Sequence, residues 1–166
     1  MMRWQRALRH LFTDQWSVRR AFPATAMRAI RNTIGEQEGQ HGGELRFAVE
    51  ASLPLVQLWR GQTARGRALE LFGQLRIWDT EHNNGVLIYL LLADKSVEIV
   101  ADRGISGKVG GADWDIVCRK MQRAFADGRF ENGVNSGIVE IGDLLAKHYP
   151  PADSPSNELP NDPVIL

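Results

Sequence analysis

The sequence predicts an α/β fold: a three-layer α/β/α sandwich with a small mixed central sheet of three to four strands flanked by helices. Residues 86–92 are all apolar or aromatic without alternation, which is typical of a strand covered on both faces. The polar residues 94–96 are few enough to force an antiparallel hairpin with the strand that follows. An earlier strand is separated from residues 86–92 by helical segments, which predicts a parallel pair joined by a right-handed crossover.

The other elements follow from the spacing of apolar residues. Loose alternation over residues 44–52 predicts the first strand, and apolar residues three to four apart predict the helices. Pro23 suits the first turn of a helix, and Asp113 suits an N-cap. A fourth strand would have to be short and poorly patterned. The predicted helices cover residues 3–22, 23–34, 63–78, 114–125 and 133–148, with a short helical segment after residue 54.

Composition and charge divide the chain into three parts. Residues 1–34 carry seven Arg against one Asp, whereas the middle of the chain is mildly acidic. The residues after 149 hold five of the seven prolines and show no periodicity. We therefore expect a basic amphipathic N-terminal helix over residues 1–22, an α/β domain over 23–149 and a disordered Pro-rich tail over 150–166.

Bulk composition also limits the function. Twenty basic and twenty acidic residues cancel, so net charge gives no reason to expect a nucleic-acid partner. No run approaches the ~18 apolar residues that a membrane span needs, and we expect no secretory signal because no apolar stretch follows the first residues. One cysteine, Cys118, suits a reducing compartment. The expected location is cytoplasmic, with peripheral attachment to the inner face of the membrane as a further expectation.

The N-terminal helix carries aromatic and aliphatic side chains at four-residue spacing, with arginines between them. One interpretation is an interfacial helix that lies on an anionic membrane, because Trp and Arg favour that position. The other is that the stripe packs on the domain or on an unidentified protein partner. The residues expected to make either contact are Trp4, Leu8, Phe12 and Trp16.

The best candidate site is a group of carboxylates and amides near the predicted hairpin. With the turn centred between residues 94 and 95, Asn84 should lie opposite Ile105, so that two polar segments meet at one sheet edge. Such oxygens are the ligands that Ca²⁺ or Mg²⁺ prefers, although Asn-Gly is also a turn signal and Asp113 also a helix cap. The candidate ligands are Asp79, Asn83, Asn84, Asp102 and Asp113.

Six short segments, taken in order and spacing, resemble the TPM domain family. They are Gly-Glu-Leu-Arg-Phe-Ala-Val at 43–49, Leu-Phe-Gly-Gln-Leu at 71–75, Asn-Asn-Gly-Val-Leu-Ile at 83–88, Asp-Lys-Ser-Val-Glu-Ile at 94–99, Gly-Ile at 104–105 and Phe-Ala-Asp-Gly-Arg-Phe-Glu-Asn-Gly at 125–133. The resemblance covers roughly residues 24–148. It implies a three-layer sandwich with a crevice at one sheet end, where some members bind Ca²⁺. Some members resemble acid phosphatases, and others serve in assembly or repair of membrane protein complexes.

One segment departs from the family pattern. Where the family usually has Gly-x-Gly-Leu-Glu, this chain has Asp-Arg-Gly-Ile-Ser at 102–106. Ser106 therefore stands at the position of the family's acidic residue, and Asp102 replaces a glycine. Arg103 in the same segment could contact a phosphate through its forked guanidinium, or pair with a nearby acidic residue.

These observations predict a non-catalytic binding or assembly module with a weak divalent-cation site at one sheet end. The alternative is a metal-assisted acid phosphatase in which Asp79 or Asp102 acts as the base. A second alternative is a peripheral membrane protein that docks through residues 3–22. No catalytic nucleophile is evident in the sequence.

Overall fold

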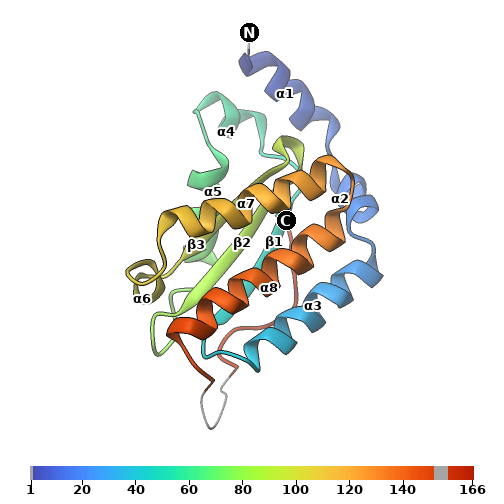
Figure 1. Cartoon of the computed structure of the whole chain (residues 1–166). Coiled ribbons are helices and arrows are strands. Elements are labelled where there is room, and N and C mark those ends of the chain that lie inside the picture. The colour runs from blue at the N-terminus through green and yellow to red at the C-terminus, as the bar shows by residue number, and fades with distance from the viewer. Residues whose placement is uncertain (1, 152–156) are drawn as a thin grey trace.

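A computed structural model describes residues 2–151 and 157–166 and confirms the three-layer α/β sandwich (Figure 1). None of the helices in these ranges is both long and apolar enough to span a bilayer. The strands are β1 (Glu44–Glu50), β2 (Gly85–Leu91), β3 (Ser96–Ala101) and β4 (Val164–Ile165). The helices are α1 (Met2–Phe12), α2 (Gln15–Ala21), α3 (Ala24–Glu38), α4 (Leu55–Trp59), α5 (Ala64–Gln74), the 3₁₀ turn η1 (Leu92–Asp94), α6 (Arg103–Ser106), α7 (Gly111–Ala126) and α8 (Phe130–His148).

The sheet has the mixed topology that the sequence predicts. Within the described residues its order is β3-β2-β1-β4. β1 and β2 are parallel and are connected through α4 and α5, whereas β3 is antiparallel to β2. All residues of β1 and β2 are buried, as expected for strands covered on both faces.

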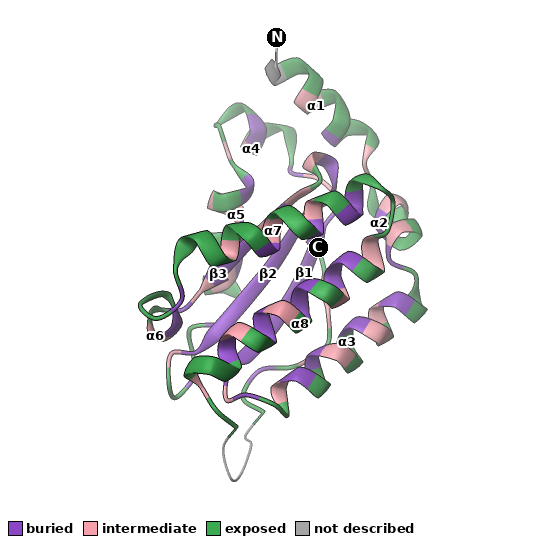
Figure 2. Cartoon of the chain, viewed as in Figure 1, coloured by how far each residue is buried: buried purple, intermediate pink, exposed green. Residues whose placement is uncertain are grey.

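The two faces of the sheet carry separate parts of the hydrophobic core. Figure 2 shows the buried β1 and β2 behind α7 and α8, whose outer sides carry exposed residues. Val86 and Ile88 of β2 pack with apolar residues of α3, α7 and α8. Leu87 and Tyr89, which alternate with them, pack with α5 and with Leu159 of the C-terminal segment. The second face is thus covered partly by a helix and partly by the segment at residues 157–166.

The hairpin between β2 and β3 is shifted from its predicted register. Leu91 pairs with Ser96, and η1 with Lys95 forms the turn between them. Lys95 has φ 49°, a left-handed conformation that closes this turn. The turn is therefore centred one residue earlier than predicted. As a result, Asn84 does not lie opposite Ile105; its neighbour Gly85 accepts a hydrogen bond from the N–H of Asp102.

The expectation of a disordered tail is wrong for residues 157–166, while residues 152–156 lie outside the described part of the chain. β4 pairs with the free edge of β1, and Leu159 is buried against the α5 side of the sheet. The Arg46 guanidinium donates hydrogen bonds to the carbonyls of Pro160 and Asp162. The segment is ordered by long-range contacts, which an absence of local periodicity does not reveal.

The predicted helix over residues 3–22 is two helices. The first ends at Phe12, and Asp14 caps the second, because its side chain accepts a hydrogen bond from the N–H of Ser17 at 2.9 Å. Val18 and Phe22 of the second segment enter the core. The predicted contact residues Trp4, Leu8, Phe12 and Trp16 remain between 52% and 78% exposed, so they do not pack into the core of their own domain.

We expect Gly85→Ala to destabilise the fold, because a Cβ at Gly85 would collide with the backbone carbonyl of Ile77. Forcing extra atoms into packed structure costs about 1–3 kcal/mol. The matched control is Gly73→Ala in the last turn of α5, where an added Cβ meets no atom within 4 Å. That change should raise stability by about 0.5–1 kcal/mol. Urea unfolding of both variants measures the difference, and equal effects would contradict the close approach at Gly85.

Candidate functional site

Polar segments meet at the sheet end where β1 and β2 begin and β3 finishes. The N–H of Asp102 donates to the carbonyl of Gly85 at 2.9 Å, and that of Gly104 donates to the carbonyl of Asn83 at 3.0 Å. The Asn84 carbonyl accepts from the N–H of Glu44 at 3.1 Å. Backbone hydrogen bonds thus continue the sheet into its loops and fix these residues beside one another.

Asn84 is fully buried at this sheet end. Its amide nitrogen donates to the carbonyl of Gly42, and its backbone N–H donates to the Thr80 hydroxyl at 3.1 Å. Its side-chain oxygen has no hydrogen-bond partner among the described residues. A buried amide oxygen in this state bears a desolvation cost, so it is available to a ligand.

Asp102 also has a buried side-chain oxygen without a hydrogen-bond partner among the described residues. The residue is 9% exposed and caps the short helix α6, where its Oδ1 accepts the N–H of Arg103 at 2.7 Å. Its Oδ2 is buried and finds no hydrogen-bond partner in the described part of the chain. The two unpartnered oxygens, one on Asn84 and one on Asp102, belong to residues on adjoining strand ends.

Arg103 and Asn83 contact each other beside these two residues. The Arg103 Nε donates to the Asn83 Oδ1 at 3.2 Å, and Asn83 adopts φ 51°. Among the described residues, the guanidinium therefore pairs with an amide and not with a nearby acidic side chain. Ser106, at the position of the family's acidic residue, is exposed and its hydroxyl lies 3.5 Å from the Arg103 carbonyl.

Two of the predicted ligands lie elsewhere. Asp79 is on the surface and forms a 2.6 Å ion pair with Arg76. Asp113 is exposed in the first turn of α7, whose N-cap is Gly110, so its predicted role as the cap is wrong. The structure therefore places Asn83, Asn84 and Asp102 on neighbouring segments at one sheet end, joined through backbone hydrogen bonds. Within the described ranges, no three His, Cys, Asp or Glu side chains are grouped to hold a metal.

A crevice of about 810 Å³ opens at the same sheet end, between the end of α3, the end of α8 and the C-terminal segment. Tyr149 joins it to the polar cluster, because its hydroxyl donates to the Gly104 carbonyl at 2.6 Å and its carbonyl accepts the Gly42 N–H at 2.9 Å. The ionisable residues that line the crevice are Glu38, His41, Glu44, Glu81, His82, Lys108, His148, Tyr149 and Glu158.

Burial perturbs three of these groups. It raises the pKa of Glu38 to about 7 and also raises the pKa of Glu44. It lowers the pKa of His41 to about 4, so this imidazole is neutral, with Nδ1 accepting the Gly43 N–H at 3.0 Å. Each carboxylate accepts a backbone N–H, from Leu45 in the case of Glu38 and from Leu159 in the case of Glu44.

None of these three residues was predicted as a site residue from the sequence. Glu44 carried the clearest signal, because it is a charged residue at the start of a predicted strand. Its partner Leu159 is 115 residues away, in the segment that was expected to be disordered. The environment of Glu38 depends on the same segment, through a hydrogen bond with the Asn161 side chain.

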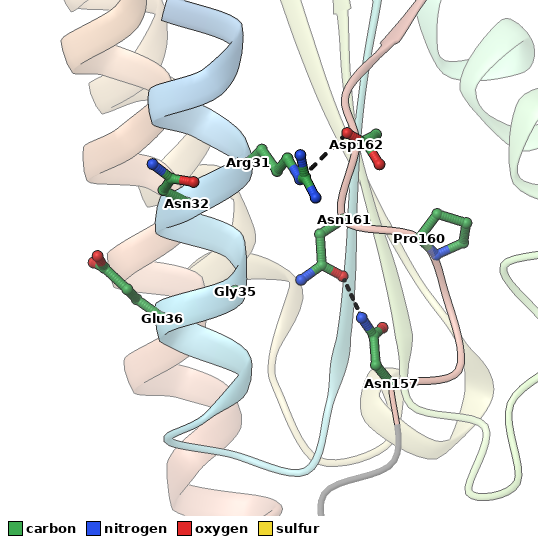
Figure 3. A pocket seen from close by; sticks show the side chains of 8 residues that line it. All are labelled: Arg31, Asn32, Gly35, Glu36, Asn157, Pro160, Asn161 and Asp162. Atoms are coloured by element: carbon green, nitrogen blue, oxygen red, sulfur yellow. Dashed lines mark hydrogen bonds and ion pairs between the residues drawn. The ribbon is translucent and has the colours of Figure 1, made fainter.

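A second, wide groove of about 680 Å³ lies between α3 and the C-terminal segment (Figure 3). Arg31 and Asp162 form an ion pair across it at 3.3 Å, and the Asn157 amide donates to the Asn161 Oδ1 at 3.0 Å. Gly35, Asn157 and Asn161 also line the crevice, so the two hollows adjoin. The groove's polar groups hold the C-terminal segment against α3.

The fold and this sheet end define a class of protein: a small α/β sandwich with buried, unpartnered oxygens where its parallel strands begin. The chain belongs to the TPM domain family, whose sequence model matches residues 20–144. A search of curated proteins found no match.

Two solved structures resemble this fold. The BA42 protein from the psychrophilic bacterium Bizionia argentinensis is 31% identical, with a TM-score of 0.78 over 87% of this chain and 95% of its own. The N-terminal domain of a protein from P. gingivalis has a TM-score of 0.61 and 18% identity, over 79% of this chain and 81% of its own. The second likeness concerns the fold alone.

Glu38→Gln should change how stability depends on pH. The raised pKa means that the folded state holds the Glu38 proton more tightly than the unfolded state. The stabilisation that protonated Glu38 gives the folded state is therefore complete below pH 4.5, and it is lost as pH rises through about 7. Across this window, the unfolding free energy of wild type relative to the variant should fall by up to about 1.4 kcal/mol per pH unit.

Chemical unfolding at a series of pH values measures this difference. Glu36→Gln is the matched control, because Glu36 is an exposed carboxylate on the same helix. A constant difference between wild type and Glu38→Gln at every pH would show that Glu38 titrates normally in the folded state.

Proposed function

We propose that this TPM domain is a non-catalytic binding or assembly module whose polar sheet end takes up a divalent cation. The observation that carries the proposal is the pair of buried oxygens, Asn84 Oδ1 and Asp102 Oδ2, that lack hydrogen-bond partners among the described residues. A buried carboxylate oxygen without a partner is costly, and a cation would remove that cost.

The chemistry of these donors suits a hard cation, Ca²⁺ or Mg²⁺. Asp102 would supply the charge and Asn84 a neutral amide oxygen, with carbonyl groups and water completing the ligands. A bound cation would neutralise Asp102 and link the start of β2 to the end of β3. One carboxylate provides little charge, so we expect weak affinity, on the order of 10⁻⁴–10⁻³ M.

Three observations favour binding over the alternative of a metal-assisted acid phosphatase. Asp102 is only 9% exposed and its Oδ1 already caps α6, so this carboxylate is poorly placed to take a proton from an attacking water. Asp79, the other proposed base, is paired with Arg76 on the surface. Arg103 uses its Nε to hold Asn83, so its fork is not wholly available to a phosphate.

An amide NMR titration of the whole chain with Ca²⁺, and separately with Mg²⁺, tests the cation site. Saturable shifts should appear in residues 83–85 and 102–106. Asp102→Asn should weaken the binding about tenfold or more, since it removes the only charged ligand. Ca²⁺ should also raise the unfolding free energy of wild type and not of the variant, because a ligand that binds only the folded state stabilises it.

Asp79→Asn is the matched control, since it removes an equal charge from a surface aspartate. Unchanged spectra at millimolar cation would exclude the site. Hydrolysis of a generic phosphate ester that depends on added metal and is lost in Asp102→Asn would instead favour the phosphatase.

A further inference from the structure

Helix α1 lies on the body of the protein with its polar face inward. Arg6 and His10 face the body, and the His10 side chain is fully buried. Trp4, Leu8 and Phe12 on the other face are 67%, 52% and 78% exposed. An amphipathic helix of a globular protein ordinarily buries its apolar stripe. Here the stripe is held outward.

A cluster of ion pairs at Asp94 fixes this orientation. Asp94 in η1 accepts from Arg6 at 2.9 Å, and the His10 Nε2 lies 3.2 Å from its Oδ1. His10 Nδ1 accepts the N–H of Leu53 at 2.9 Å, which leaves the imidazole proton on Nε2, facing Asp94. Burial alone would raise the pKa of Asp94, but the hydrogen bond and charge of Arg6 outweigh it and keep that pKa low.

Helix α4 extends the exposed apolar face of α1. The two helices contact each other at one end of the molecule (Figure 1). The rings of Trp4 and Trp59 meet edge to face with centroids 5.7 Å apart, and Leu11 and Leu55 border one groove. The resulting surface, here termed the α1–α4 face, presents Trp4, Leu8, Leu11, Phe12, Leu55, Val56 and Trp59, each at least 42% exposed.

The charges beside this face are positive. Arg9 on α1 has a 60% exposed side chain and forms a 3.6 Å ion pair with the largely buried Asp94, and Arg60 follows Trp59 directly and is exposed. Arg19 and Arg20 on α2 are exposed as well. Asp14 is the only acidic residue among residues 1–34. A second copy of the chain would bring like charges together at such a face, whereas an anionic surface would complement it.

We propose that the α1–α4 face docks on an anionic lipid bilayer. The exposed tryptophans would lie at the level of the headgroups, the aliphatic side chains would enter the outer part of the acyl region, and the arginines would contact lipid phosphates. The Asp94 ion pairs present the helix with this face outward before any contact with lipid. The proposal rests on different residues from the cation site and does not depend on it.

Flotation of the whole chain with phosphatidylcholine vesicles, with and without about one third phosphatidylglycerol, tests the proposal. The protein should float with the anionic vesicles, less with the neutral ones, and less as salt increases. Leu8→Ala/Phe12→Ala should reduce partitioning by about tenfold or more. Arg9→Gln/Arg60→Gln should reduce it roughly twenty-fivefold, since each arginine near an anionic surface contributes about fivefold.

Matched controls come from other faces of the molecule. Leu69→Ala/Val139→Ala removes two exposed aliphatic side chains on α5 and α8, and Arg119→Gln/Arg123→Gln removes two exposed arginines on α7. Both should partition like wild type. Failure of wild type to float, or equal losses in controls and test variants, would overturn the proposal. The proposal would also be overturned if wild type did not bind vesicles and instead sedimented as a dimer that Leu8→Ala/Phe12→Ala converts to a monomer.

Discussion

The parallel pairing of β1 with β2 is the constraint on which the rest of this structure depends. Seven residue pairs are in register from Glu44–Gly85 to Glu50–Leu91, and every residue in them is buried. The strands therefore need a layer on each face and a neighbour on each edge. α3, α7 and α8 cover one face, α5 and the C-terminal segment cover the other, and β3 and β4 take the edges.

Charged residues of β1 determine which segments cover it. Glu50 at its end accepts hydrogen bonds from Arg67 of α5 and from the hydroxyl of Tyr89. Glu44 and Arg46 bind the backbone of the C-terminal segment. Breaking a largely buried ion pair such as Glu50–Arg67 costs about 3–5 kcal/mol. These side chains therefore specify which segments form the second layer, in addition to the stability that apolar packing provides.

Patterns that are local in the sequence predicted most of the fold. The apolar run over residues 86–92 and the short turn after it were enough to predict the sheet and the meeting of its polar ends. The turn itself was misplaced by one residue, because the 3₁₀ turn η1 has no distinct periodicity. The hairpin was also enough to predict that the segments of Asn83, Asn84 and Asp102 meet at one sheet end, while their role as cation ligands stays a prediction. Asp79 lies elsewhere, because its place depends on how the chain leaves α5.

Features that depend on distant contacts could not be predicted. The apolar stripe of α1 was recognised, yet its outward orientation follows from ion pairs with Asp94, which is 88 residues away from Arg6. The order of the C-terminal segment depends on Glu44 and Arg46. The Asn161 side chain of that segment forms a hydrogen bond with Glu38 that partly offsets the effect of burial on its pKa. Local sequence patterns do not identify a contact residue that lies half a chain away.

The late position of β4 has a consequence for the order in which the protein acquires its structure during synthesis. The groups that bind residues 157–166 on β1 are made 115 residues before Leu159, so β1 stays open at one edge on the ribosome until nearly the whole described chain has emerged. An open strand edge readily pairs with another chain, and closure by so distant a segment is slow. A nascent chain of this protein therefore exposes an unpaired strand edge for most of its translation. A chaperone on the ribosome is most useful under this condition.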